Sequence, residues 1–270
     1  MFPVINVGLL FTELPWAERF AAVAGAGHDR VEFPWPSLPP GEVTRLVRAA
    51  GVRVALLNMD AGDLAAGDLA AGDRGYGNDP RLTELWRLRL RQALDLAAEL
   101  DCPLVNVLAG RLLPEPDRAH QVRCLIDNLR WAAGLAARTG RTLVVEPIND
   151  RDVPGYLVPR VTGVLELLGH VDHDGVALQL DAYHVAAMGD DLTHAIEMAG
   201  DRIRHVQVAG FPGRHEPGAG ELDRLLAALA GAGYAGGIGL EYLPTRPSAA
   251  SLRAVTARHP LLRPYRERTP

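Results

Sequence analysis

The sequence predicts a single (β/α)8 barrel domain that spans residues 1–270. Short apolar runs alternate with helical segments eight times over about 250 residues, the usual length of such a barrel. Several of these apolar runs are followed directly by a polar side chain. In LVVEPIND, for example, Glu146 follows the apolar run LVV. An open, doubly wound sheet is the rival fold, but no GxGxxG pattern follows the first run.

The eight predicted strands are short, apolar and rich in β-branched residues, which is typical of parallel strands covered on both faces. Along the chain they comprise residues 4–11, 31–33, 52–58, 104–108, 143–145, 176–181, 203–208 and 237–241.

Each predicted strand is followed by a helical pattern. Pro15 opens the first helix, Gly51 stops the second, and one face of the third carries Trp86, Leu90 and Leu94. The predicted helices comprise residues 15–26, 41–50, 80–100, 117–139, 161–168, 192–199, 222–230 and 248–258.

Composition excludes several classes of protein. All 28 basic residues are arginine, so the absence of lysine excludes Schiff-base and pyridoxal-phosphate chemistry. A net charge of −5 without a basic cluster argues against nucleic-acid binding. Cys102 and Cys124 lack CxxC spacing and are expected to be free thiols. The sequence shows no N-terminal signal-peptide pattern and no apolar segment long enough to span a membrane, so we expect a soluble cytoplasmic protein that does not bind membranes. Assembly into a homo-oligomer is possible on this sequence.

One segment interrupts the alternation. Residues 62–73 read GDLAAGDLAAGD, a five-residue unit that is repeated and then begun again. One explanation is that duplication of the unit has lengthened a surface loop that tolerates insertions. The other is an active-site lid, because this loop follows a strand and would lie on the catalytic face of a barrel.

Four oxygen-bearing side chains mark the ends of the last four strands: Glu146, Asp181, Gln207 and Glu241. In a barrel these strand ends are neighbours and form the active site. Three converging carboxylates would repel one another and raise their own pKa values unless a cation lay between them. Carboxylate and amide oxygens suit Mg²⁺ or Mn²⁺ better than Zn²⁺. The sequence therefore predicts a divalent metal site.

Four further residues are candidates for binding substrate. His184 lies just past the sixth strand, where it can hydrogen-bond a substrate oxygen. His205 shares a strand face with Gln207 and so points into the barrel, either as a core histidine or as a substrate ligand. Arg214 is either a bidentate ligand for a substrate carboxylate or a solvated turn charge. Asp152 lies in the polar loop after the fifth strand.

These motifs together resemble the hydroxypyruvate isomerase family, one of the xylose-isomerase-like barrels. The resemblance runs from Asn6 to Pro244, and the stretch from His205 to Glu221 is its most specific part. The strings that carry it are LFTELPW, VEFPWP, the GD-AAG-D-RG loop, VEPIND-RD-PGY, LQLDAYH, HVQVAG-PGRHEP-GELD and GLEYLP. The repeated GDLAA unit departs from the family, which carries fewer copies.

The resemblance implies roles for the four strand-end residues. Those matching Glu146, Asp181, Gln207 and Glu241 would hold the metal, and the two glutamates would also form the acid–base pair. Gln207 favours the isomerase branch, because related sugar epimerases carry His at that place.

The implied reaction interconverts hydroxypyruvate and tartronate semialdehyde by moving a proton between C2 and C3. A metal that chelates the adjacent carbonyl and hydroxyl oxygens would stabilise the enediolate, while one glutamate removes a proton and the other returns one. Alternatives are a 2-oxo-tetronate isomerase, a ketose 3-epimerase, a metal-dependent lyase or phosphodiesterase, and a non-catalytic sugar-binding barrel. The acidic charge argues against a nuclease, and the retained glutamates argue against a non-catalytic barrel.

Overall fold

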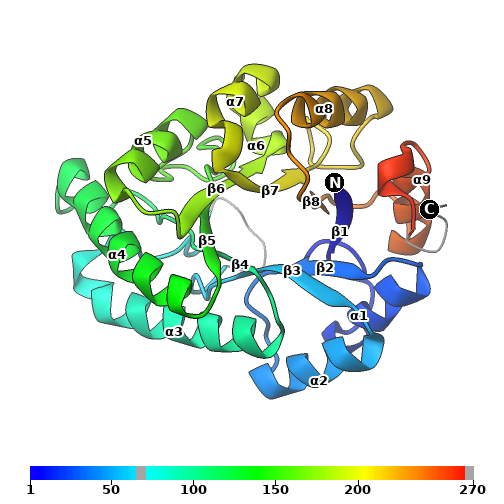
Figure 1. Ribbon diagram of the computed structural model, residues 1–270, viewed down its shortest axis with the longest axis horizontal. Coiled ribbons are helices and arrows are strands. Elements are labelled where there is room, and N and C mark those ends of the chain that lie inside the picture. The colour runs from blue at the N-terminus through cyan, green and yellow to red at the C-terminus, as the bar shows by residue number, and fades with distance from the viewer. Residues whose placement is uncertain (65–70, 265–270) are drawn as a thin grey trace.

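Eight parallel strands close into a barrel in the computed structural model, which describes residues 1–64 and 71–264 (Figure 1). Each strand pairs with the next along the chain, and β8 pairs with β1 to close the ring. The predicted fold is thus confirmed. The strands are β1 (Phe2–Asn6), β2 (Arg30–Phe33), β3 (Arg53–Asn58), β4 (Leu104–Asn106), β5 (Thr142–Val145), β6 (Val176–Asp181), β7 (Ile203–Val208) and β8 (Gly237–Leu240).

The helices form a ring outside the barrel (Figure 1). Within the described residues the α-helices are α1 (Trp16–Gly25), α2 (Pro40–Ala50), α3 (Thr83–Glu99), α4 (Arg118–Arg138), α5 (Val161–Val171), α6 (Ala182–Ala187), α7 (Leu192–Ala199), α8 (Ala219–Gly231) and α9 (Ser248–Thr256). Residues 1–64 and 71–264 also contain the short 3₁₀ helices η2 (Pro80–Leu82), η3 (Gly200–Arg202) and η4 (Pro260–Leu262).

The structure differs from the predicted elements near the pocket. Strand β4 ends at Asn106 instead of residue 108. Strand β1 ends at Asn6 instead of residue 11, because the Asn6 side chain accepts a hydrogen bond from Gly8 N and its carbonyl accepts one from Leu10 N, which turns the chain. The helix α6 was not predicted. It follows β6 directly, and the Asp181 carboxylate caps it by accepting a hydrogen bond from Tyr183 N.

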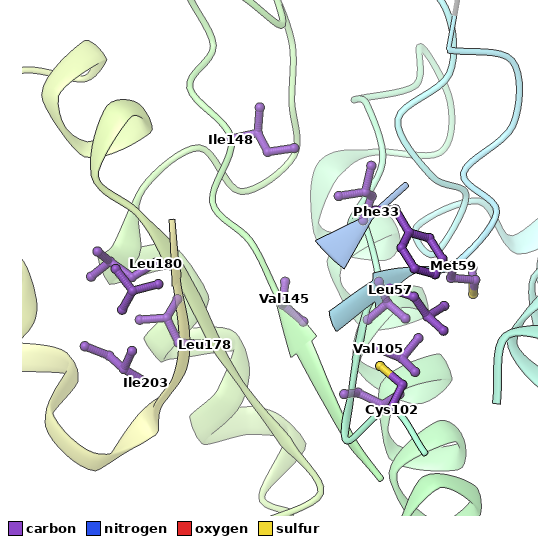
Figure 2. Close-up of a cluster of buried hydrophobic side chains, with 14 of the residues drawn as sticks. Phe33, Leu57, Met59, Cys102, Val105, Val145, Ile148, Leu178, Leu180 and Ile203 are labelled. Atoms are coloured by element: carbon purple, nitrogen blue, oxygen red, sulfur yellow. The ribbon is translucent and has the colours of Figure 1, made fainter. Parts of the chain in front are cut away.

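Side chains alternate along each strand between the helix-facing side and the barrel interior. Figure 2 shows part of the helix-facing core, where Phe33, Leu57 and Val105 lie together, as do Leu178, Leu180 and Ile203. A small apolar layer inside the barrel contains Leu56, Val144, Ala177 and Leu104. The interior positions nearer the C-terminal strand ends are polar, so the strand period itself directs polar groups into the barrel.

Residues 62–73 were predicted to form a tolerant loop or a lid, but residues 65–70 of that stretch lie outside the described part of the chain. Across the described ranges, no helix is both long enough and apolar enough to cross a membrane.

Candidate active site

A pocket of about 300 Å³ opens at the C-terminal ends of the strands. This is the face on which (β/α)8 barrels carry their active sites. Its lining includes Asn6 from β1, Glu146 after β5, His184 from α6, Arg214 after β7 and Glu241 after β8. Four of the predicted site residues therefore line one cavity, namely Glu146, His184, Arg214 and Glu241, whereas Asp181 and Gln207 are not part of its lining.

Glu146 follows β5 directly and is buried, with 5% of its surface exposed. Asn106, at the end of the neighbouring strand β4, donates a hydrogen bond from Nδ2 to Glu146 Oε2 at 3.0 Å. The Tyr156 hydroxyl donates to the Glu146 carbonyl oxygen at 3.2 Å. Both the backbone and the carboxylate of Glu146 are thus held in place, which leaves Oε1 directed toward His184 at 3.7 Å.

Arg214 connects two other carboxylates. Its Nη2 donates to Asp181 Oδ2 at 3.1 Å and to Glu241 Oε2 at 2.6 Å. Arg214 itself adopts a left-handed backbone conformation with φ of 56°, and its carbonyl accepts a hydrogen bond from Leu243 N. The sequence left open whether Arg214 binds a substrate carboxylate or is a solvated charge. In the structure its guanidinium is buried and bound to the site's own carboxylates.

The carboxylates shift each other's protonation. Burial raises the pKa of Glu146 well above its ordinary value, and the negative charges of Glu241 and Asp181 raise it further. Burial also raises the pKa of Asp181 and of Glu241, although the Arg214 cation opposes both shifts. For Arg214, burial favours a lower pKa, but the surrounding carboxylates outweigh it and raise the value. A further cation among these oxygens would relieve the repulsion.

The donor set suits a metal ion. Among the described residues, Glu146, Asp181 and His184 form a buried cluster that can hold a metal, because one potential ligand atom of each lies within 4.8 Å of the others. The oxygen donors are of the kind that hard divalent cations prefer.

His184 is held from both sides of its ring, by Asn149 at Nδ1 and by Arg214 at Nε2. Asn149 Oδ1 accepts from Arg151 N and Asp152 N, which fixes the amide so that Nδ2 faces His184 Nδ1 at 2.6 Å. Asn149 N also donates to Nδ1 at 3.4 Å. Burial lowers the pKa of His184 well below its ordinary value, and Arg214 adds to this effect. On the other side of the ring, Nε2 faces Glu146 Oε1 at 3.7 Å and Asp181 Oδ2 at 3.5 Å, and Arg214 Nη1, which can only donate, lies 3.3 Å from it.

Glu32, on the interior face of β2, organises the layer beneath the pocket. It is fully buried and accepts hydrogen bonds from Asn6 Nδ2 at 3.0 Å and Gln207 Nε2 at 2.7 Å, and it pairs with His205 Nε2. Because a carboxylate only accepts, Gln207 must turn its nitrogen toward Glu32. Gln207 Oε1, which accepts from Gln179 Nε2 at 2.7 Å, retains a second lone pair for a cation.

Asn6 links this layer to the pocket. The nitrogen that donates to Glu32 also donates to Glu241 Oε1 at 3.0 Å. Sequence reasoning missed Asn6, Glu32 and Asn106. The signal that identified the residues of the later strands, a polar side chain that interrupts or ends an apolar run, applies to these three as well. Asn6 and Asn106 each end an apolar strand, and Glu32 interrupts the run VEF.

The two remaining candidates lie away from the cavity lining. His205 points into the barrel as predicted, where it is buried against Glu32 and belongs to the supporting layer. Asp152 accepts hydrogen bonds from Asn149 Nδ2 at 3.0 Å and from the Tyr183 hydroxyl at 2.8 Å. It therefore supports the residue that orients His184.

Comparison with known proteins gives matches along most of the chain. The model of the family described as xylose isomerase-like TIM barrel matches residues 20–258. A 2-oxo-tetronate isomerase of Pectobacterium atrosepticum is 35% identical over 242 residues, covering 88% of this chain and 90% of that protein. A putative hydroxypyruvate isomerase of Streptomyces coelicolor is 36% identical over 263 residues, covering 92% of each chain. A crystal structure from Brucella melitensis, described as an AP endonuclease of family 2, superposes with a TM-score of 0.86 at 34% identity and covers 93% of this chain and 96% of its own.

Proposed function

The chain belongs to the xylose isomerase-like TIM barrel family and is an isomerase, and we propose that it interconverts hydroxypyruvate and tartronate semialdehyde. The observation that carries this proposal is the meeting of Glu146 and Glu241 at one pocket, each oriented by an asparagine from a neighbouring strand. Two held carboxylates with raised pKa values are what a proton transfer between adjacent carbons requires.

In the proposed reaction one glutamate takes a proton from C3 of hydroxypyruvate. The electron pair of the broken C–H bond forms the C2–C3 double bond, and the carbonyl pair moves onto the C2 oxygen. The C3 hydroxyl proton then passes to the C2 oxygen, so that C3 becomes the aldehyde and C2 carries a hydroxyl, while the electron pair of the C2–C3 double bond takes a proton at C2 from the second glutamate. Proton exchange with solvent restores both glutamates. The same atoms are conserved throughout, so no external oxidant or reductant is needed.

We assign the divalent cation, Mg²⁺ or Mn²⁺, to Glu146, Asp181, Gln207 and Glu241. When bound, it supplies positive charge that offsets the negative charge developing on the two substrate oxygens. His184 is left out of this set because Arg214 Nη1 already lies 3.3 Å from its Nε2. Arg214 also fixes the directions of Asp181 and Glu241.

A 2-oxo-tetronate isomerase is the second candidate, supported by the 35% identity to the Pectobacterium protein of that name. A pocket of about 300 Å³ admits both three- and four-carbon acids, so its volume alone does not separate the two reactions. Incubating the purified protein with a panel of three- to six-carbon hydroxy-oxo acids and ketoses, followed by NMR, identifies the substrate. Turnover of neutral ketoses alone would contradict both candidates.

The acid–base assignment is tested with Glu146→Gln and Glu241→Gln. Each amide retains an oxygen for the cation but loses the proton acceptor, so we expect appreciable metal affinity with turnover lowered about 10²-fold or more. In D₂O the wild-type protein should place deuterium on substrate carbon, because a carboxyl proton exchanges with solvent. Near-normal turnover in both variants would exclude these residues as acid and base, and complete absence of deuterium would favour a hydride shift.

A further inference from the structure

Within residues 1–64 and 71–264, Asn58 is the polar residue of the pocket lining whose side chain makes no hydrogen bond or ion pair. It is half-buried at the end of β3. The other polar side chains of the lining all have protein partners, namely Asn6, Arg74, Glu146, His184, Arg214 and Glu241. The Asn58 amide therefore has its two N–H donors and its carbonyl oxygen available to a ligand.

The strand geometry directs this amide into the cavity. Asn58 is the last residue of β3, and Leu56, two positions earlier, belongs to the apolar layer inside the barrel. Because side chains alternate along a strand, Asn58 also faces the interior. In the closed ring of eight strands β3 stands opposite β7, which carries Gln207 and precedes Arg214 (Figure 1). The amide thus faces the strand ends that carry the carboxylates from the other side of the pocket.

Apolar side chains flank Asn58 in the lining. Pro34 follows β2 and Leu108 follows β4, the two strands that pair with β3. A substrate oxygen on this side loses water when it binds, so it must find a protein donor or remain unsatisfied at a cost. A hydrogen bond from the amide is also stronger here than in water, because the apolar walls lower the local dielectric.

We propose that Asn58 binds the substrate carboxylate by donating a hydrogen bond from Nδ2 to one of its oxygens. The inference rests on the proposed function and refines its substrate class. In hydroxypyruvate the oxygens on C2 and C3 take part in the reaction, which leaves the C1 carboxylate as the remaining polar group. Asn6 Nδ2 and Arg214 Nη2 already donate to the protein's own carboxylates. Asn58 Nδ2 is the donor left for the substrate, and it favours short hydroxy-oxo acids over neutral ketoses.

Two replacements of similar shape test the direction of this hydrogen bond. Asn58→Leu removes both donor and acceptor, whereas Asn58→Asp keeps an acceptor oxygen and replaces the donor with a second one. D-glycerate is an acid of the same length as hydroxypyruvate without the carbonyl. We expect Asn58→Leu to weaken glycerate binding about 10–10²-fold, measured by NMR titration with Mg²⁺ present. Asn58→Asp should weaken it further, because two carboxylates then face each other.

The kinetics should show the same selectivity. The carboxylate does not react, so its contact contributes equally to the ground state and the transition state. Asn58→Leu should therefore raise KM for hydroxypyruvate about 10-fold or more, while kcat changes less than about threefold. Dihydroxyacetone has a hydroxymethyl group in place of the carboxylate. Its kcat/KM should fall by a smaller factor, because a hydrogen bond to a neutral oxygen contributes less than one to a charged oxygen.

Met59→Leu is the matched control. Met59 follows Asn58 and is buried in the helix-facing core with Leu57 (Figure 2). Its replacement disturbs the same strand end without facing the pocket and conserves volume, so glycerate affinity should stay at the wild-type value. Asn58→Leu should melt no lower than the wild type, because no hydrogen bond within the protein is lost.

Several results would overturn the proposal: no glycerate binding by the wild type, unchanged affinity in Asn58→Leu, retained affinity in Asn58→Asp, or equal losses in Met59→Leu. Retained affinity in Asn58→Asp would mean that Asn58 accepts a hydrogen bond from a substrate hydroxyl. If the wild-type protein does not turn over hydroxypyruvate, the proposed reaction fails, and the glycerate measurement still decides the role of Asn58.

Discussion

Gly239 is the interior position of β8 that faces Glu32, and replacing it tests the polar layer beneath the pocket. A Cβ at this position would lie 2.6 Å from both Glu32 carboxylate oxygens and 2.8 Å from Gln207 Cγ. Ordinary contacts begin near 3.4 Å, so the carboxylate must move. It cannot move freely, because Asn6, Gln207 and His205 all bind it.

The expected size of the effect follows from these contacts. Overpacking a tightly filled interior costs about 1–3 kcal/mol. Weakening one hydrogen bond to a buried charge adds about 1.5–3 kcal/mol. Restricting the unfolded chain by the change from Gly to Ala offsets about 0.4–1 kcal/mol. We therefore expect Gly239→Ala to destabilise the protein by about 2–4 kcal/mol, which lowers the melting temperature on the order of 5–10 °C.

Thermal unfolding followed by circular dichroism measures this effect. Gly169→Ala in α5 is the matched control, because no atom lies within 4 Å of its added Cβ. That variant should be as stable as the wild type or slightly more stable. If Gly239→Ala melts at the wild-type temperature, or if both variants lose equal stability, the account of a tightly filled layer around Glu32 is wrong.

Three further outcomes follow from the geometry. Mg²⁺ or Mn²⁺ should raise the melting temperature of EDTA-treated protein, and Asp181→Ala should abolish the rise. If neither ion changes the melting temperature, the predicted metal site is wrong. Cys124 should react with a thiol reagent before Cys102, because Cys102 is fully buried and burial raises its pKa to about 12; equal rates in native protein would contradict this. Burial opposes ionisation of Glu216, but hydrogen bonds from Ser251 and Thr245 hold its pKa at about 2. Because this pKa is depressed in the folded protein, the ionised Glu216 stabilises the fold above its ordinary pKa of 4.5, and this stabilisation is lost as the pH falls toward 2. The difference in unfolding free energy between wild type and Glu216→Gln, measured by urea unfolding, should therefore shrink from pH 5.5 to pH 3. A constant difference would contradict the assignment.

The sequence alone predicted the barrel and the ends of its strands that carry polar groups. Both depend on local patterns, namely the alternation of apolar runs with amphipathic segments and the abrupt carboxylates at Glu146 and Glu241. Parallel strands in a closed barrel bring their C-terminal ends to one face, so the neighbourhood of these residues follows without knowledge of side-chain contacts. Asn6 and Asn106 were missed because the predicted strands 4–11 and 104–108 continue past them, whereas β1 and β4 end at these residues.

The choice of partners was decided only by the tertiary structure. Glu32 meets His205 across 173 residues of sequence because closure of the barrel brings β2 and β7 to a shared interior. Asn149, which contacts Nδ1 of the His184 ring, lies 35 residues earlier in the chain. Whether Arg214 binds substrate or the site's own carboxylates depends on a left-handed turn after β7 that directs its guanidinium inward. Hydrogen bonds and ion pairs form between atoms a few ångströms apart, and those distances are set by strand register and barrel closure, which the local residue pattern does not contain.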